Sequence, residues 1–314
     1  MKRLFMTAML LQLLVLKVYS QEEPIELITA NCKIKGTLTL PAQKQDIPLV
    51  LIISGSGPTD RDCNQPRMKT NAFKYLADDL QKNGIASVRF DKRGIAESAD
   101  TNVKEINMRF DDFIDDVKAW IELLSKDKRF SGLIIAGHSE GSLIGMAACK
   151  NNNKVKGYIS IAGAGRPIDE VLKEQLAAQS KEYQDIVFPM IDRLKKGDTI
   201  QNVAKSLYTL FRPSVQPYMI SWLKYNPQEE ISKLNIPILI LQGSTDIQVS
   251  ETDADLLAKA NPAAKEKIIK NMNHVLKDCD TKDKKINMAT YFQAELPLNK
   301  EFVKVIIKFI KGIK

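Results

Sequence analysis

A pentapeptide of the G-x-S-x-G type offers the clearest chemistry in this sequence. It reads Gly137-His138-Ser139-Glu140-Gly141, and it lies between the apolar run 133–136 and the helix-like run 142–148. Glycines at the outer positions let neighbouring backbone approach closely, so the central serine can be held in a strained turn with its hydroxyl exposed. The first turn of the helix that follows supplies unpaired N–H groups, which stabilise a negative charge that develops nearby. This strand, turn and helix pattern indicates that Ser139 is a nucleophile.

A serine nucleophile needs a base to take its proton and an acid to orient that base. The chain contains two histidines, His138 and His274. His138 lies inside the turn, where we expect its side chain to point away from the serine and to pack or bind backbone, which leaves His274 as the base. Asp246 and His274 each follow an apolar strand-like run, and the carboxyl ends of parallel strands meet at one edge of a sheet. The sequence therefore predicts a triad of Ser139, Asp246 and His274.

The choice of the acid has two alternatives. Asp253 and Asp255 are rivals, although both fall within the predicted helix 252–260. Asp246 can also be only a turn-capping aspartate. The turn 243–246 suits a carboxylate aimed at a histidine, which favours the catalytic interpretation.

A reacting carbonyl oxygen needs hydrogen-bond donors as its negative charge develops. The segment 54–62 reads Ser-Gly-Ser-Gly-Pro-Thr-Asp-Arg-Asp and follows the buried strand-like run 49–53. A dinucleotide-binding loop is excluded because the third glycine of G-x-G-x-x-G is absent and proline follows the second glycine. We therefore expect the backbone N–H groups of Ser56 and Glu140 to form an oxyanion hole.

Strand-like and helix-like segments alternate through most of the chain, which predicts an α/β fold with a mostly parallel central sheet and helices on both faces. The expected strands are a pair within 25–40 with Gly36 near a turn or bulge, 49–53, 85–90, 133–136, 155–162, 236–241 and 265–269, and the expected helices are 71–82, 110–126, 142–148, 252–260 and one from about 299. Strand-like runs disappear between about 168 and 233. We expect an inserted helical cap over the active site there, with a bundle that only packs on the domain as the alternative.

The first twenty residues have the layout of a secretory signal peptide. Lys2 and Arg3 precede a leucine-rich run to about Val18, and small residues stand before Gln21. An uncleaved membrane anchor is the competing interpretation, but the apolar run is short for a span. The sequence thus predicts a signal peptide at 1–20, a mature domain at 21–314, a secreted or periplasmic location, and no membrane association after cleavage.

The composition fits a packed soluble domain and argues against nucleic-acid binding. The 314 residues are 44% hydrophobic and 27% charged, with a net charge of +8. Removal of residues 1–20 lowers the net charge to +5, because it removes three basic residues and no acidic one. Lys304, Lys308 and Lys311 recur at helical spacing opposite apolar residues, which indicates a surface helix with its lysines in water.

The cysteines give no unique pairing and match no metal motif; they are Cys32, Cys63, Cys149 and Cys279. Disulfides are permitted in an exported protein, and a bridge between Cys63 and Cys279 is one option because both fall in loops near the predicted site. Cys149 fits a small buried residue. We expect no metal and no cofactor, because two histidines make a histidine-built zinc site improbable and the triad chemistry needs neither.

Four segments of the chain together resemble one group of enzymes. The segments 55–62, 91–94, 137–141 and 271–274 are similar to those of the Est10-like carboxylesterases of the α/β-hydrolase superfamily, which are related to the serine aminopeptidase S33-like hydrolases. The resemblance implies the α/β-hydrolase fold and hydrolysis of short-chain acyl esters, with Ser139, Asp246 and His274 matching the triad. Ala96 departs from the pattern, since such proteins more often have a glycine there.

These observations predict a serine esterase that acts on small-molecule esters through an acyl-enzyme intermediate. One alternative is a peptidase that removes N-terminal residues. It needs a carboxylate to bind the substrate amine, and Glu170, Glu174 and Glu182 are available in the predicted cap. A second alternative is a hydrolase-fold binding protein without turnover, against which the complete triad argues.

Overall fold

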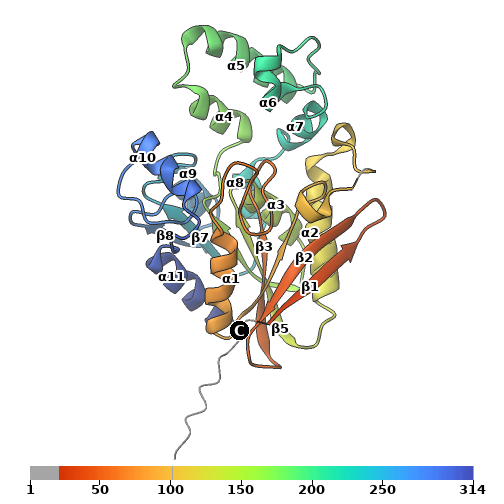
Figure 1. Ribbon diagram of the computed structural model, residues 1–314, viewed down its shortest axis with the longest axis vertical. Helices are drawn as coiled ribbons and strands as arrows, with labels where there is room; N and C mark the ends of the chain where they lie inside the picture. The colour runs from red at the N-terminus through yellow and green to blue at the C-terminus, as the bar shows by residue number, and fades with distance from the viewer. Residues whose placement is uncertain (1–20, 101, 314) are drawn as a thin grey trace, which may run out of the picture.

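The computed structural model describes residues 21–100 and 102–313, so the predicted signal peptide at 1–20 lies outside the described residues. Its strands are β1 (Gln21–Ile28), β2 (Lys33–Leu40), β3 (Ile47–Ile53), β4 (Ala86–Phe90), β5 (Phe130–His138), β6 (Val155–Ile161), β7 (Ile238–Gly243) and β8 (Lys265–Ile269). They form one sheet in the order β1-β2-β4-β3-β5-β6-β7-β8 (Figure 1). β2 pairs antiparallel with β1 and β4, and the other neighbouring strands are parallel. The prediction of a mostly parallel sheet is confirmed.

The described helices include α1 (Ala72–Lys82), α2 (Phe110–Leu124), α3 (Glu140–Cys149), α4 (Ile168–Leu176), α5 (Lys181–Lys195), α6 (Tyr208–Phe211), α7 (Gln216–Trp222), α8 (Pro227–Ser232), α9 (Glu251–Ala260), α10 (Lys284–Ala289) and α11 (Lys300–Lys311). α1 and α11 cover one face of the sheet, and α2, α3, α8 and α9 cover the other. Helices on both faces are therefore confirmed. The short helix α10 has no counterpart among the predicted segments.

Successive residues of β3 enter two separate cores. Leu49, Leu51 and Ile53 pack with α2 and α3, whereas Val50 and Ile52 pack with α1 and α11. A strand covered on both faces has no polar side, which explains why this part of the sequence is continuously apolar.

The C-terminal helix α11 docks through one stripe. Its apolar residues Phe302, Ile306 and Ile310 are buried, while Lys304, Lys308 and Lys311 are exposed. The predicted surface helix with solvated lysines is confirmed.

Gly36 lies in the middle of β2, so its expected place near a turn is wrong. The turn between the first two strands is at residues 29–32, where the N–H of Thr29 donates to the oxygen of Cys32 at 3.0 Å. A Cβ at Gly36 would lie 2.7 Å from the carbonyl oxygen of Arg89 in β4. The glycine is needed for the close approach of the neighbouring strand.

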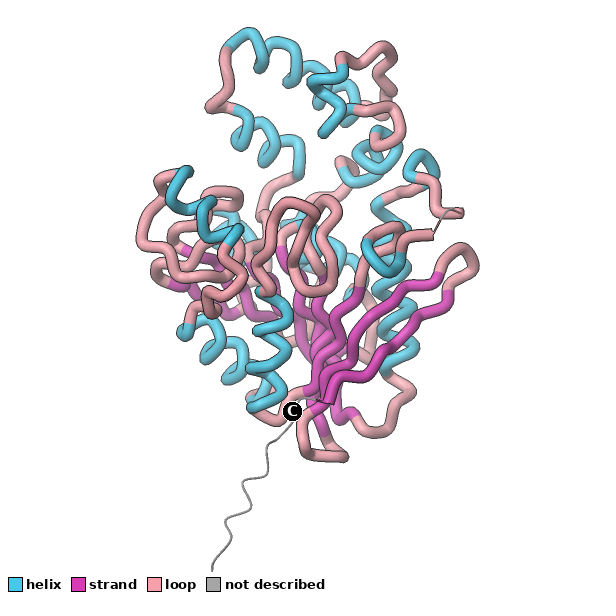
Figure 2. Tube along the Cα trace, viewed as in Figure 1, coloured by secondary structure: helices cyan, strands magenta, loops and turns pink. Residues whose placement is uncertain are grey.

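The segment between β6 and β7 begins as a separate helical layer. The helices α4 to α7 lie beyond the carboxyl ends of the parallel strands, at the top of Figures 1 and 2. α8 instead returns to the sheet and packs against α3 and α9. The helical layer is attached through α7 and α2, where the rings of Trp222 and Phe110 stack with their centroids 5.6 Å apart.

The four cysteines are all described, all buried and all unpaired. The bridge considered between Cys63 and Cys279 is therefore absent. Burial raises the pKa of the Cys63 thiol to about 12, so it remains a thiol at neutral pH. None of the helices in residues 21–100 and 102–313 combines the length and the apolar character that a membrane crossing requires.

Candidate active site

Ser139 forms a strained turn between β5 and α3. Its backbone has φ 54° and ψ −122°, a conformation that residues with a Cβ atom rarely adopt. A Cβ at Gly137 would lie 2.2 Å from the oxygen of Gly141, and a Cβ at Gly141 would lie 2.5 Å from the oxygen of Ile53. Both outer positions of the pentapeptide must therefore be glycine.

The loops after β7 and β8 bring Asp246 and His274 into contact. Both side chains are buried, and Nδ1–H of His274 donates to Oδ2 of Asp246 at 2.7 Å. A proton on Nδ1 leaves Nε2 of the neutral ring without one, which is the tautomer of a general base. His274 and Ser139 line the same cavity of about 60 Å³.

Asp246 is held as a carboxylate by its neighbours. Its Oδ1 accepts from the N–H groups of Gln248 at 2.7 Å and Val249 at 3.0 Å, and its Oδ2 also accepts from Nε2 of Gln242 at 3.0 Å. Burial alone would raise its pKa, but interaction with His274 and these backbone N–H groups outweighs burial and lowers the pKa of Asp246. The carboxylate therefore persists at neutral pH and can stabilise a charged imidazole.

The rival carboxylates point elsewhere. Asp253 accepts from Nη2 of Arg166 at 2.7 Å and from Oγ of Ser250 at 2.7 Å, so it caps α9 and pairs with a cation. Asp255 is exposed on α9. The histidine bonds to Asp246 instead.

His138 supports the loop that carries His274. Its Nε2 bonds to the backbone oxygen of His274 at 2.8 Å, so Nε2 carries the proton, and the two rings lie 4.7 Å apart. Its Nδ1 is buried without a partner among the described residues. Burial, and then the neighbouring His274, lower the pKa of His138 to about 3, so its ring is neutral at neutral pH. The expected backbone hydrogen bond of His138 is present.

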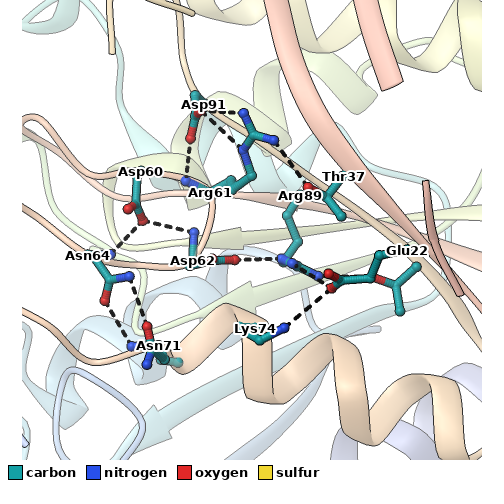
Figure 3. A network of polar contacts seen from close by, with 12 residues as sticks. Glu22, Thr37, Asp60, Arg61, Asp62, Asn64, Asn71, Lys74, Arg89 and Asp91 are labelled. Atoms are coloured by element: carbon teal, nitrogen blue, oxygen red, sulfur yellow. Dashed lines mark hydrogen bonds and ion pairs between the residues drawn. The ribbon is translucent and has the colours of Figure 1, made fainter. Parts of the chain in front are cut away.

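The loop after β3, which carries Ser56, is anchored by partly buried ion pairs (Figure 3). Asp91 accepts from the N–H and from Nη2 of Arg61 at 2.7 Å and 2.6 Å. Arg89 of β4 donates to Asp62 at 2.9 Å and to Glu22 at 3.0 Å. The Arg61–Asp91 pair is the most buried of these and so is screened least by solvent, and together the pairs hold the loop against β4 and β1.

The two backbone donors expected for the oxyanion hole flank Ser139. Ser56 lines the same cavity as Ser139 and His274, and Glu140 is the first residue of α3. Neither of their N–H groups donates a hydrogen bond within residues 21–100 and 102–313. Both are therefore free to bind a developing oxyanion.

The side chain of Glu140 takes part in a buried cluster that the sequence analysis missed. Nζ of Lys92 donates to Oε2 of Glu140 at 2.8 Å and to the oxygen of Gly55 at 2.6 Å, and the hydroxyl of Tyr218 donates to Oε1 of Glu140. Lys92 follows β4 and Tyr218 lies on α7, so the three residues meet only through the fold. No spacing pattern in the sequence signals such a contact.

A larger cavity of about 600 Å³ lies beside this cluster, bounded by the loops after β3 and β4 and by α7. Its apolar wall contains Val103, Met108, Phe113 and Val215. Two of its three carboxylates are paired with cations, Glu140 with Lys92 and Glu105 with Arg212. The third, Asp100, accepts from the N–H of Asn102 at 2.8 Å and pairs with no cation in residues 21–100 and 102–313. The cavity therefore suits a partly apolar group.

Ala96 lies in the loop after β4 with φ 44°, a left-handed conformation. Glycine adopts this conformation without strain, which accounts for the glycine more often found there in the proteins that the loop resembles.

Comparison with known proteins agrees with this architecture. Residues 68–207 match the family model of serine aminopeptidase S33. The chain is 26% identical to esterase EstD of Thermotoga maritima over 260 residues, which is 79% of this chain and 59% of EstD. It superposes on Est1E of Butyrivibrio proteoclasticus with a TM-score of 0.60 at 15% identity, covering 92% of this chain and 96% of Est1E. The Pyrococcus furiosus esterase Pf2001 gives a TM-score of 0.60 at 14% identity, covering 94% and 92%.

The sheet order, the serine turn and these superpositions show an α/β-hydrolase fold. Within this fold, residues 68–207 contain the serine aminopeptidase S33 match. It spans about 59% of the length of EstD.

Proposed function

We propose that this protein is a serine esterase that hydrolyses short-chain acyl esters. The observation that carries the proposal is the 2.7 Å hydrogen bond from His274 to Asp246, which orients the histidine at the cavity that it shares with Ser139. The esterase names of EstD and Pf2001 support this substrate class.

The reaction follows from the assigned groups. Oγ of Ser139 attacks the acyl carbon while Nε2 of His274 takes the hydroxyl proton and then returns it to the leaving alcohol. The N–H groups of Ser56 and Glu140 bind the oxyanion, each contributing about 3 kcal/mol to transition-state stabilisation. A water molecule activated by His274 then cleaves the acyl-enzyme and releases the acid.

The cavities suggest where each part of the ester binds. The space at Ser139 is about 60 Å³, which favours a short acyl group. The cavity of about 600 Å³ is lined by Gly57 and Glu140, the chain neighbours of Ser56 and Ser139, and can receive the larger alcohol part. A panel of p-nitrophenyl esters from acetyl to octanoyl tests this, and we expect kcat/KM to fall beyond butyryl. A maximum at octanoyl would contradict the assignment.

The Ser139→Ala variant tests the proposed nucleophile. We expect it to lose hydrolysis of p-nitrophenyl butyrate and labelling by a fluorophosphonate probe while it keeps the wild-type circular dichroism spectrum. Ser142→Ala is the matched control, because Oγ of Ser142 bonds to the side chains of Tyr158 and Ser160 and not to the cavity. Retained activity in Ser139→Ala would reject the esterase mechanism, and an unlabelled wild-type protein would favour a binding protein.

The family description favours one second candidate, removal of N-terminal residues from peptides. Such a substrate carries a charged amine, and two of the three carboxylates that line the larger cavity, Glu105 and Glu140, are paired with cations, which leaves Asp100 alone to bind it. We expect leucine p-nitroanilide to be cleaved far more slowly than p-nitrophenyl butyrate. The reverse preference would establish the peptidase.

We also propose export of the protein, based on the signal-peptide pattern of residues 1–20. Expression of the full chain in a bacterial host, followed by N-terminal sequencing of the exported fraction, should give Gln21 as the first residue. An intact N-terminus in the cytoplasm would contradict this.

A further inference from the structure

Lys92 contacts the loop that carries Ser56. Its side chain is 5% exposed, and its ammonium group donates to the oxygen of Gly55 at 2.6 Å and to Oε2 of Glu140 at 2.8 Å. The ammonium also lies 5.6 Å from the centre of the Phe113 ring. Two acceptors and an aromatic face therefore hold this cation in a defined position.

The oxygen that Lys92 binds belongs to the same peptide group as the N–H of Ser56. In a trans peptide the C=O and N–H bonds point in opposite directions, so a fixed oxygen fixes the direction of that N–H. Glycine at position 55 avoids a tight contact, since a Cβ would lie 3.1 Å from Cβ of Ser139, but glycine also lets this peptide rotate easily. A charged donor on the oxygen opposes this rotation and polarises the amide, which strengthens the N–H as a donor.

The same ammonium also holds the residue that bears the second backbone donor. The carboxylate of Glu140 lies between Nζ of Lys92 and the hydroxyl of Tyr218, while its N–H is at the start of α3. Lys92 thus contacts Gly55, whose peptide group includes the N–H of Ser56, and Glu140, which bears the second N–H.

We propose that Lys92 is a positioning residue of the oxyanion hole, which holds the Gly55–Ser56 peptide against Glu140 so that the two N–H groups converge on one point. This inference rests on the proposed esterase function. The competing interpretation is that Lys92 and Glu140 form an ion pair that serves packing alone.

The decisive variant removes both charges together. Lys92→Met alone leaves the buried carboxylate of Glu140 unpaired and can unfold the protein. The double variant Lys92→Met/Glu140→Gln avoids this at similar side-chain volume. We expect its kcat for p-nitrophenyl butyrate to fall about 10- to 100-fold with KM within about threefold of wild type, because the lost interaction acts only in the transition state. Glu140→Gln alone keeps the bond from Lys92 to Gly55, so its kcat should fall less than that of the double variant.

A matched control removes another buried ion pair. The double variant Arg166→Met/Asp253→Asn eliminates the 2.7 Å pair beside α9, and we expect its kcat to stay within about threefold of wild type even if its melting temperature falls. The rate of fluorophosphonate labelling of Ser139 supplies a readout that does not depend on the choice of ester, and it should fall in parallel with kcat in the Lys92→Met/Glu140→Gln variant.

The outcomes separate this inference from the proposed function. If the wild-type protein neither hydrolyses esters nor reacts with the probe, both fail. If the wild type is active and Ser139→Ala is not, but Lys92→Met/Glu140→Gln keeps wild-type kcat and labelling rate, the ion pair serves packing alone and only the inference on Lys92 is overturned.

Discussion

Acid should destabilise this protein through His138. The unfolded imidazole has a pKa of about 6.5, whereas burial lowers the pKa of the folded His138 to about 3. Between these values the unfolded chain binds more protons than the folded one, so the stability linked to this group is fully present above pH 6.5 and is lost as the pH falls. Each pH unit changes the free energy of unfolding by about 1.4 kcal/mol, so the loss from pH 6.5 to 4.5 is about 3 kcal/mol.

The assay compares the wild type with His138→Asn by urea unfolding at a series of pH values from 7 to 4.5. Asparagine offers a side-chain N–H to the oxygen of His274 but does not titrate. We expect the stability of the wild type to fall by about 3 kcal/mol relative to the variant. Subtraction removes the contribution of other titrating groups that the substitution leaves unchanged.

Magnetic resonance gives a direct check on the same group. The chain contains two histidines, so the imidazole signal that disappears in His138→Asn identifies His138. The reasoning is refuted if that signal titrates above about pH 5.5 in the folded protein, or if the two stability curves stay parallel.

Three further outcomes are expected. Asp246→Asn should lower kcat by about 10⁴, because an amide beside Nδ1 favours the wrong tautomer of His274; ester hydrolysis measures this, and a loss below tenfold would contradict it. Gly141→Ala should cost about 3 kcal/mol of unfolding free energy in urea, because its Cβ would meet the oxygen of Ile53 at 2.5 Å; a neutral effect would show that the turn can relax. Burial raises the pKa of Tyr158, so the stability linked to this group is present below about pH 10 and falls above that value by about 1.4 kcal/mol per pH unit. Between pH 10 and 11, the free energy of unfolding in urea should therefore decrease less in Tyr158→Phe than in the wild type. Equal decreases in the two proteins would disprove this.

The sheet and its serine turn were predictable because their signals are local. A continuous apolar run such as 49–53 marks a strand covered on both faces, and glycines around Ser139 mark a turn that larger residues cannot form. The same local reasoning failed at Gly36, where the need for glycine comes from Arg89 in another strand.

The cluster around Glu140 was not predictable because its members come from distant parts of the chain. Lys92 and Tyr218 are separated from Glu140 by 48 and 78 residues. Their residue types fit an ordinary charged turn and an ordinary aromatic helix, so only the fold reveals that they share one buried carboxylate. The spacing of the four cysteines in one sequence likewise could not decide whether they form disulfides or remain free thiols.

The two edges of the sheet have a consequence for behaviour at high concentration. β1 carries the charges of Glu23 and Glu26 beside Pro24, and β8 begins with the exposed charged residues 265–267. Proline offers no N–H to an incoming strand, and like charges on two copies repel each other across a shared edge. Neither edge strand therefore pairs readily with a strand of a second molecule, which protects the protein against ordered aggregation.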